Sequence, residues 1–461
     1  MFKAMKKYLI PLILLFTLAG VALFLPYRAW LENRLEVILE AKGFENVALT
    51  ISSVGLNSAA LENVSIGGEN KLNVKNITLA YAPLDLWNGY LRDLTIAGVS
   101  IDVKQDQGRW VVSGLEGLSS TPESNVSKPL AVPVTSEQLA RIPFERIDLE
   151  DSLLNMEFGE AKLSLPLNLI WQKSPQSQFD YKGNNLSFSF NTLEVGAEDL
   201  TLNAAINETN TAWVGPWALQ KLSATGTSLP IPAMKGAGTI SLNQTRADIK
   251  GKLLNDDQSW LADFTVDYNF VDSTQSTLTI LHAGMPWKHG RIDVRNIKIP
   301  LSGNAPIKVT LQIERVSVQE LMESLTGDRI AATGEVSGAL PIVIERSGKI
   351  TVLPGNLQSV GPGTISMPPE VIPGDNEQVA LVRQILEDLK YTGLAIELKN
   401  DDTGRLGILM RFEGNNPDVY EGRPVKLNVN LTGDVIEFIQ QNVLLLTSPE
   451  EFIKQESDDQ N

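Results

Sequence analysis

The chain has no cysteine and only two histidines among its 461 residues. Without cysteine, disulfide frameworks, thiolate metal sites and cysteine nucleophiles are excluded. The two histidines, His282 and His289, lie in one short stretch, and their sequence neighbourhood has too few carboxylates to complete a metal centre. We therefore expect two histidines on a turn and no histidine metal site.

Basic residues are also too few for a nucleic-acid-binding protein. The chain has 39 lysines and arginines against 55 acidic residues, for a formal net charge of −16, whereas a nucleic-acid interface needs a concentrated basic surface. Catalytic fingerprints are missing too, because the sequence has no G-x-S-x-G, no GxxxxGK[ST], no HExxH and no Rossmann-type glycine motif. We expect no enzyme, no catalytic residues, no cofactor and no metal.

A long apolar run near the N-terminus is the first positive signal. Lys3, Lys6 and Lys7 precede an uncharged stretch from Tyr8 to Tyr27. About 20 helical residues cover the roughly 30 Å hydrocarbon core of a bilayer. Since positive charges before a span favour the cytoplasmic side, the pattern predicts a single-pass anchor with a cytoplasmic N-terminus and a translocated body.

A cleaved signal peptide is the alternative explanation of the same run. The run is long for a signal sequence, and Pro26 with Arg28 makes a poor cleavage site. Gly20 and Ala22 nevertheless leave room for cleavage. We expect the span to be retained, and retention or cleavage stays open at this point.

After the anchor the apolar period changes from helical to strand-like. Residues 28–43 space Leu31, Leu35 and Ile38 as an amphipathic helix that ends at Gly43. From Val47 onward the period is two. One unit, with three apolar residues spaced by three and then by two, recurs at 61–66, 74–79, 91–96, 144–149 and 294–299, and more weakly at 197–202 and 219–224. Its first apolar residue joins the other two on one face only where the strand bulges or bends.

These patterns predict a mainly β protein. The N-terminal transmembrane helix is followed by an elongated, curled antiparallel β-sheet of roughly 25–30 strands, with a few short helices near the C-terminus. Such a sheet hides its apolar face in a sandwich or barrel, or curls into an open groove. Only one clear linker interrupts the chain, which favours the apolar groove.

The predicted regions follow the composition of the chain. They are a cytoplasmic tip and anchor (1–27), an amphipathic helix (28–43), an N-terminal β-repeat region (44–118), a flexible linker (119–137), a central β-groove (138–330), a C-terminal domain (331–446) and a polar tail (447–461).

The C-terminal region predicts a helix over 376–390 and strands over 394–398, 406–412 and 425–431. The loop between the last two strands is rich in oxygen atoms, which are carried by Glu413, Asn415, Asn416, Asp418 and Glu421. Such a loop could hold a cation, but the flanking strands favour a polar turn.

One set of apolar side chains is expected to line the groove. Its members come from the repeated units and from the C-terminal strands, at Ile66, Ile77, Leu79, Ile96, Ile101, Val103, Ile396, Ile408, Met410, Leu427 and Val429.

The sequence resembles the AsmA-like envelope proteins and, within them, the YdbH family of intermembrane phospholipid transport proteins. The general likeness lies in the anchor and in VGLNSAALENVSIGG (54–68) and VKNITLAYAPLDLWNGYLRDLTIAGVSIDV (74–103). The C-terminal 120 residues are more specific, with GEVSGALPIVIERSGKITVLPGNL (334–357) and FEGNNPDVYEGRPVKLNVNL (412–431). That domain has also carried a label for dicarboxylate transport.

The resemblance implies a bridge anchored in the bacterial inner membrane, with its body in the periplasm, that carries phospholipid to the outer membrane. It also implies a small outer-membrane lipoprotein as partner at the C-terminal sheet edge, near 425–431. The alternative is a structural or assembly factor for outer-membrane biogenesis that tethers the envelope without moving lipid. A periplasmic enzyme is the least favoured hypothesis. Expected partners are membrane phospholipids, and no nucleic acid.

Overall fold

The computed structural model describes residues 28–431, except for 69–70, 88–89, 107–108, 116–141, 159–160, 174–175, 191–192, 208, 210, 227–230, 303–304, 327–329, 346–349, 370–376 and 401–405. The predicted span Tyr8–Tyr27, the linker 119–137 and the polar tail 447–461 lie outside these residues. None of the helices within the described residues is both long and apolar enough to span a bilayer.

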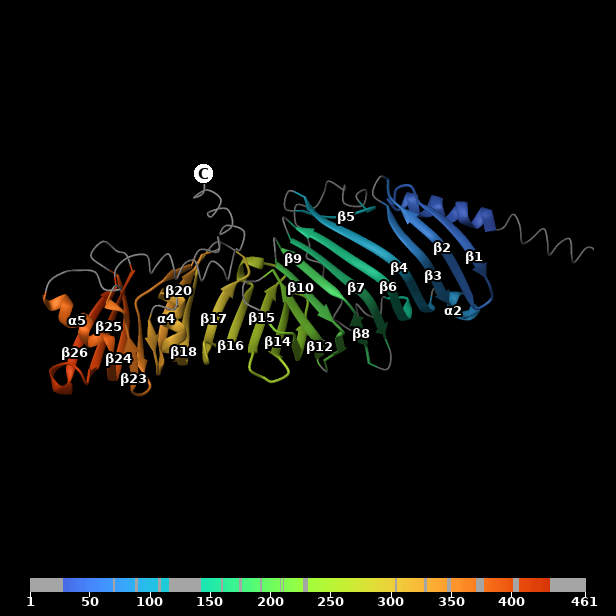
Figure 1. Cartoon of the computed structure of the whole chain (residues 1–461). Helices are drawn as coiled ribbons and strands as arrows, with labels where there is room; N and C mark the ends of the chain where they lie inside the picture. The colour runs from blue at the N-terminus through green and yellow to red at the C-terminus, as the bar shows by residue number, and fades with distance from the viewer. Residues whose placement is uncertain are drawn as a thin grey trace, which may run out of the picture. The chain divides into compact units, whose positions relative to one another are not determined.

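The protein is mainly β, as predicted. The described residues form 26 strands that belong to one sheet, with few helices (Figure 1). The chain divides into two compact units, residues 1–219 (unit 1) and residues 220–461 (unit 2). The predicted region boundaries do not coincide with this division, and they stay predictions.

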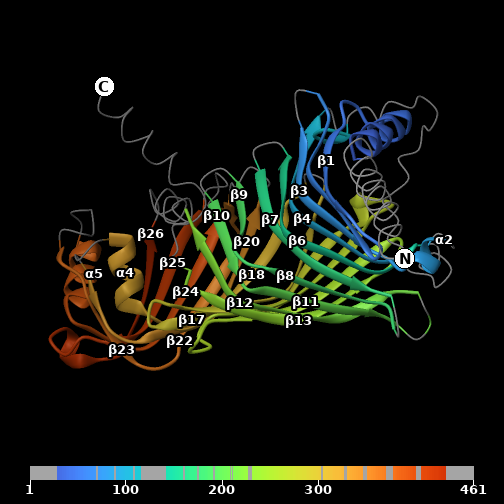
Figure 2. The ribbon, with the colours of Figure 1, turned by 90° about the vertical axis from the view of Figure 1, so that its right-hand side faces the viewer.

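Unit 1 contains a helix over 28–41, a short helix α2 (Pro83–Trp87) and a curled layer of strands (Figure 2). Its strands are β1 (Ala48–Val54), β2 (Ser58–Ile66), β3 (Leu72–Ala80), β4 (Leu91–Asp106), β5 (Arg109–Val112), β6 (Phe144–Phe158), β7 (Ala161–Gln172), β8 (Gln178–Gly183), β9 (Leu186–Phe190), β10 (Leu193–Glu198), β11 (Leu200–Ile206) and β12 (Trp213–Thr225), whose last residues belong to unit 2.

One pair of strands departs from the predicted antiparallel order. β4 and β6 are parallel, with Leu94 opposite Ile147 and Ile96 opposite Leu149. A parallel pair needs a crossover connection of about a dozen residues or more. The long segment between β5 and β6 supplies that length. The flanking pairs β3 with β4 and β6 with β7 are antiparallel.

Unit 2 carries the remaining elements. Its strands are β13 (Met234–Leu242), β14 (Arg246–Leu254), β15 (Leu261–Asn269), β16 (Thr277–Trp287), β17 (Gly290–Pro300), β18 (Ile307–Ser317), β19 (Ala331–Ala332), β20 (Glu335–Ile344), β21 (Ile350–Val352), β22 (Gly355–Ser359), β23 (Gly363–Ser366), β24 (Leu389–Asn400), β25 (Leu406–Asn415) and β26 (Val425–Leu431). Its helices are α4 (Val318–Thr326), α5 (Glu377–Glu387) and the 3-10 turns η2 (Ser273–Gln275) and η4 (Tyr420–Gly422).

The bends predicted for the repeated unit are present at several copies. The third residue of three copies, Asn63, Asp199 and Asn296, has a positive φ of 53°, 54° and 55°. Asparagine and aspartate tolerate this left-handed conformation better than other side chains. The bend at Asn63 lets Leu61 share a face with Val64, and both pack in one apolar cluster. In these three copies the spacing of three and then two coincides with a left-handed residue, whereas the third residues of other copies, such as Asn76 and Asp93, have no positive φ.

The helix over 28–41 covers the edge strand β1. Glu32 accepts a hydrogen bond of 2.7 Å from the backbone N–H of Ile51, and Glu36 accepts one of 3.3 Å from that of Leu49. Leu31 and Leu35 pack against the cluster formed by β1 to β4. An open strand edge invites pairing with other chains, and these two carboxylates occupy amide groups that would otherwise offer such an edge.

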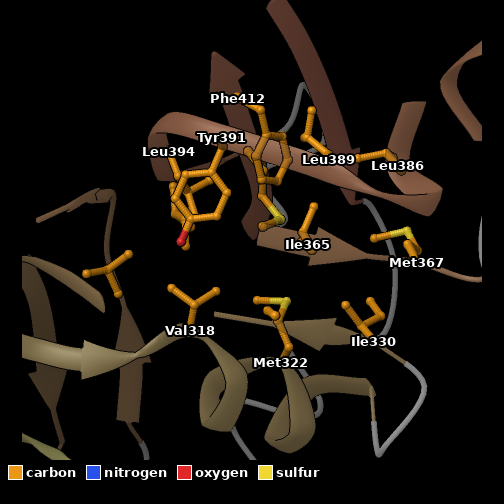
Figure 3. Packing of buried hydrophobic residues seen from close by; sticks show 14 of the residues in the cluster. Val318, Met322, Ile330, Ile365, Met367, Leu386, Leu389, Tyr391, Leu394 and Phe412 are labelled. Carbon is orange, nitrogen blue, oxygen red and sulfur yellow. The ribbon is translucent and has the colours of Figure 1, made fainter. Parts of the chain in front are cut away.

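Unit 2 ends in a closed core. Met322 from α4 and Leu386 from α5 pack with Tyr391, Phe412 and Met410 of the last strands (Figure 3). The Tyr391 and Phe412 rings lie 6.3 Å apart. The predicted helix over 376–390 is shorter in the structure, because β24 begins at Leu389, whose fully buried side chain belongs to the strand and not to the helix.

Candidate functional site

An unbroken row of apolar and aromatic side chains crosses unit 1. Each member lies directly opposite the next on the neighbouring strand, so all of them share one face of the sheet. This row, called row A, runs through nine strands as Ile51, Leu61, Ile77, Ile96, Leu149, Leu169, Tyr181, Leu202 and Trp217.

A second apolar row runs beside row A on the same face. This row B lies two positions from row A on seven strands and three positions from it on β1, where the register shifts between Ile51 and Ser53. It contains Val54, Ala59, Leu79, Leu94, Ile147, Trp171, Phe179 and Ala204. From Leu61 to Trp217 the side chains of row A are half-buried, neither enclosed nor fully exposed. The face therefore offers an apolar surface that a flexible apolar ligand could contact.

The opposite face of the same strands is polar. Asn155 donates a hydrogen bond of 2.8 Å to Asp102, and Ser164 donates one of 2.9 Å to Asn155. Glu157 lies 3.2 Å from Lys104 and 3.8 Å from Lys162. A hollow of about 700 Å³ is lined by these groups and their neighbours. The two faces thus differ sharply in polarity across a single layer of strands.

Unit 2 has a corresponding row, and half of its residues are enclosed in a core. Met285, Ile292, Ile313, Gly338, Leu357, Ile396, Met410 and Val429 lie opposite one another on eight successive strands. Four of them, Ile313, Leu357, Ile396 and Met410, are buried in the core that α4 and α5 cover. This part of the apolar face is filled by the protein's own side chains.

The eleven predicted groove residues fall into two sets. Half-buried side chains in unit 1 form the first set, comprising Ile66, Ile77, Leu79, Ile96, Ile101 and Val103. The second set lies in unit 2, where Ile396, Ile408, Met410 and Leu427 are buried in the closed core and Val429 packs against it. The structure places each set on an apolar face, and their role toward lipid stays a prediction.

The oxygen-rich loop after β25 is a turn with a buried anchor. The Asn416 side chain is 3% exposed, and its amide nitrogen donates to the carbonyl oxygens of Gln384 at 2.8 Å and Ile385 at 3.2 Å. These carbonyls lie in the last turn of α5, where helices leave acceptors unsatisfied. Within the described residues no cluster of carboxylates and histidines could hold a metal ion.

Both histidines have carboxylate neighbours that the sequence did not indicate. His282 lies 2.8 Å from Asp293, which also accepts from Arg291 at 3.0 Å. His289 contacts Glu320 of α4. Only His289 lies at the turn between β16 and β17, whereas His282 is a strand residue, so the predicted pair on one turn is wrong. Antiparallel pairing of β16 with β17 placed Asp293 beside His282.

Two tyrosines on the apolar face are held neutral. Burial raises the pKa of Tyr181 to about 12, and its hydroxyl donates to the Pro166 carbonyl at 2.8 Å. Burial also raises the pKa of Tyr391, whose hydroxyl donates to the Thr333 carbonyl at 2.6 Å. A neutral phenol that keeps its hydrogen bond suits an apolar surface, because desolvation opposes the charged form.

The last five residues of row A were missed by the sequence reasoning, which named groove residues only in regions 66–103 and 396–429. Leu149, Leu169, Tyr181, Leu202 and Trp217 belong to it. A signal was present, since Leu163, Leu165, Leu167 and Leu169 alternate without interruption along β7. Which strands lie side by side, however, follows from pairing, and pairing was not readable from the alternation.

Comparison with known proteins gives one match. Residues 258–441 match the family model described as YdbH-like, intermembrane phospholipid transport protein YdbH. No curated protein and no solved structure matches the chain. The match covers β15 to β26, including the closed core, and it confirms the resemblance that the C-terminal motifs indicated. Over residues 258–441, this chain is therefore similar to the YdbH-like family.

Proposed function

We propose that the protein carries phospholipid between the inner and outer membranes of a bacterial envelope, with acyl chains lying on its apolar β face. The observation that carries this proposal is row A, which crosses nine strands without a polar interruption. Each methylene removed from water contributes about 0.8 kcal/mol. The description of the matching family, intermembrane phospholipid transport, supports the same function.

We place the anchor at Tyr8–Tyr27, with the N-terminus in the cytoplasm and the body in the periplasm. The lysines before this uncharged run support that orientation. The resemblance also supports a small outer-membrane lipoprotein that adds a strand to the edge of β26, Val425–Leu431. Photo-crosslinkers on β26 that capture no lipoprotein would contradict this partner.

The function can be tested by site-specific photo-crosslinking in the full chain. Leu202 lies on row A, and the adjacent Thr201 is exposed on the opposite face of the same strand. A benzophenone side chain at position 202 should form adducts with radiolabelled phospholipid in cells, whereas the same group at position 201 should form few. Equal labelling at both positions, or none at either, would overturn lipid carriage on this face.

A structural or assembly role is the second candidate, and the filled core of unit 2 favours it for that region. Twenty side chains of the described residues are buried in this core, so lipid cannot lie on the face beneath α4 and α5 while they are packed. If the protein only tethers the membranes or assists assembly, benzophenone at position 202 should capture no lipid although the protein remains folded.

A further inference from the structure

The most exposed large apolar side chains of the described part of unit 1 gather at one end of it. Leu56, in the turn between β1 and β2, is 82% exposed, and Leu84, in α2, is 81% exposed. Trp30, near the start of the helix over 28–41, is 59% exposed. Large apolar groups this exposed cost solubility, and grouped together they mark a surface that another apolar phase covers.

The turn that carries Leu56 is bound to the segment that carries Leu84. The Tyr81 hydroxyl donates to the Gly55 carbonyl at 2.7 Å, and the Tyr81 amide donates to the Asn57 carbonyl at 2.9 Å. Gly55 in turn donates to the Ser58 carbonyl at 2.8 Å. Leu56 therefore lies on a turn, and Leu84 on a short helix, that hydrogen bonds of Tyr81 hold together.

The start of the helix over 28–41 lies toward the same end. The Glu36 carboxylate accepts from the Leu49 amide, and the Glu32 carboxylate accepts from the Ile51 amide. The earlier helix residue therefore pairs with the later residue of β1. The helix and β1 are thus antiparallel, and the first helical residues lie near Val54, where β1 ends and the turn begins. The uncharged run Tyr8–Tyr27 joins the body at this end.

We propose that Leu56, Leu84 and Trp30 form a lip that inserts into the surface of the bilayer that holds the run Tyr8–Tyr27. The lip rests on the proposed anchor, since a run held in the bilayer would keep the lip close to that bilayer, and the neighbouring Arg28 suits the headgroup region. Interfacial elements bury their apolar side chains about 5–10 Å deep in a bilayer. Val54 and Leu79 of row B reach this end, so the lip adjoins the apolar face.

This contact does not depend on lipid carriage, and a depth measurement tests it separately. Because the chain has no cysteine, the single variants Leu56→Cys and Leu84→Cys each accept one environment-sensitive fluorophore. The labelled full chain is reconstituted in vesicles of phosphatidylethanolamine and phosphatidylglycerol that contain spin-labelled acyl chains. We expect a blue-shifted emission and several-fold stronger quenching by the acyl-chain label than by aqueous iodide.

Phe190→Cys is the matched control. Phe190 is 45% exposed and lies in β9 opposite Ala161, at the other end of the strands of the same unit. It should be quenched by iodide and hardly by the acyl-chain label. Tyr81→Phe, which removes the hydroxyl bond to Gly55, should weaken acyl-chain quenching at position 56. Equal quenching at positions 56, 84 and 190, or preferential quenching of positions 56 and 84 by iodide, would overturn the lip.

Discussion

The two units carry the same kind of apolar row but treat it differently. In unit 1, row A is half-buried and the described α-helices are the 28–41 helix at the β1 edge and the short α2. In unit 2, half of the corresponding row is buried in the closed core that α4 and α5 cover, together with Tyr391 and Phe412. Alternation along strands produces an apolar face in both, and covering helices decide whether that face is a surface or a core.

The largest expected difference comes from one carboxylate placed on each row. Leu427→Asp puts a charge into the closed core and should lower the free energy of unfolding of unit 2 by on the order of 4 kcal/mol. Leu202→Asp, on a half-buried row, should leave unit 1 folded and reduce the phospholipid adducts of a benzophenone side chain placed at the neighbouring row A position, 217. Hydrogen exchange measured by mass spectrometry on peptides from each unit checks the folding of both variants, and adduct yield at position 217 checks lipid contact. Equal destabilisation by the two variants would erase the distinction between surface and core.

The seal of unit 2 also depends on one buried amide. Asn416→Ala leaves the Gln384 and Ile385 carbonyls without their donor at the end of α5. The expected cost is about 1–3 kcal/mol, as for other unsatisfied buried polar groups. Urea unfolding measures it, with the exposed Asp418→Ala in the same loop as control. A loss as large for Asp418→Ala would show that the loop acts as a whole and not through Asn416.

The bends in the strands are expected to have a smaller effect. Asn63 has a φ of 53° in β2, where a β-branched residue is strained by about 1–2 kcal/mol. Asn63→Val should therefore lower the thermal midpoint of unit 1, whereas Asn63→Gly should change it little. The same pair of substitutions at Asn296 tests unit 2. If Asn63→Val is as stable as Asn63→Gly, the left-handed bend is not needed to hold Leu61 and Val64 on one face.

The last expected effect is seen only at alkaline pH, and it is absent under ordinary conditions. The pKa of Tyr181 rises from its ordinary value of 10.0 to about 12 through burial. Below pH 10 the phenol is neutral in the folded and the unfolded chain, and its stabilising contribution is complete. Between pH 10 and 12 only the unfolded chain loses the proton, so the free energy of unfolding falls as pH rises.

Tyr181→Phe removes this dependence. The variant should lose less stability than the unsubstituted chain across that interval, as followed by urea midpoints at several pH values. If the free energy of unfolding falls as steeply with pH in Tyr181→Phe as in the unsubstituted chain, the Tyr181 phenol is hydrated in the folded protein. Row A would then be more open than its burial indicates.

Much of the architecture was readable from local patterns. Alternation predicted the strands over 406–412 and 425–431, and the observed β26 has the predicted bounds. The mixed spacing of the repeated unit predicted bends, which the left-handed Asn63 and Asn296 confirm. The C-terminal motifs indicated the family that residues 258–441 match. These features are local, so neighbouring residues in the chain carry enough information to specify them.

The candidate site was readable only in part. Ile77 and Ile96 were predicted for the apolar face, but Leu169, Tyr181 and Trp217 were not, although they extend the same row. The parallel pairing of β4 with β6 was also unexpected, because it joins strands that a long segment separates. Register between distant strands depends on which edges meet, and no spacing within one strand encodes that.

By itself the sequence determined a chain of strands with one apolar face, bent where Asn and Asp accept a positive φ, and it excluded thiol chemistry. Tertiary structure alone decided that the face is half-open in unit 1 and sealed in unit 2, and that Asn416 binds the end of α5 instead of a cation. The physical reason is that side-chain direction is a local property of the backbone, whereas burial depends on which distant elements pack above it.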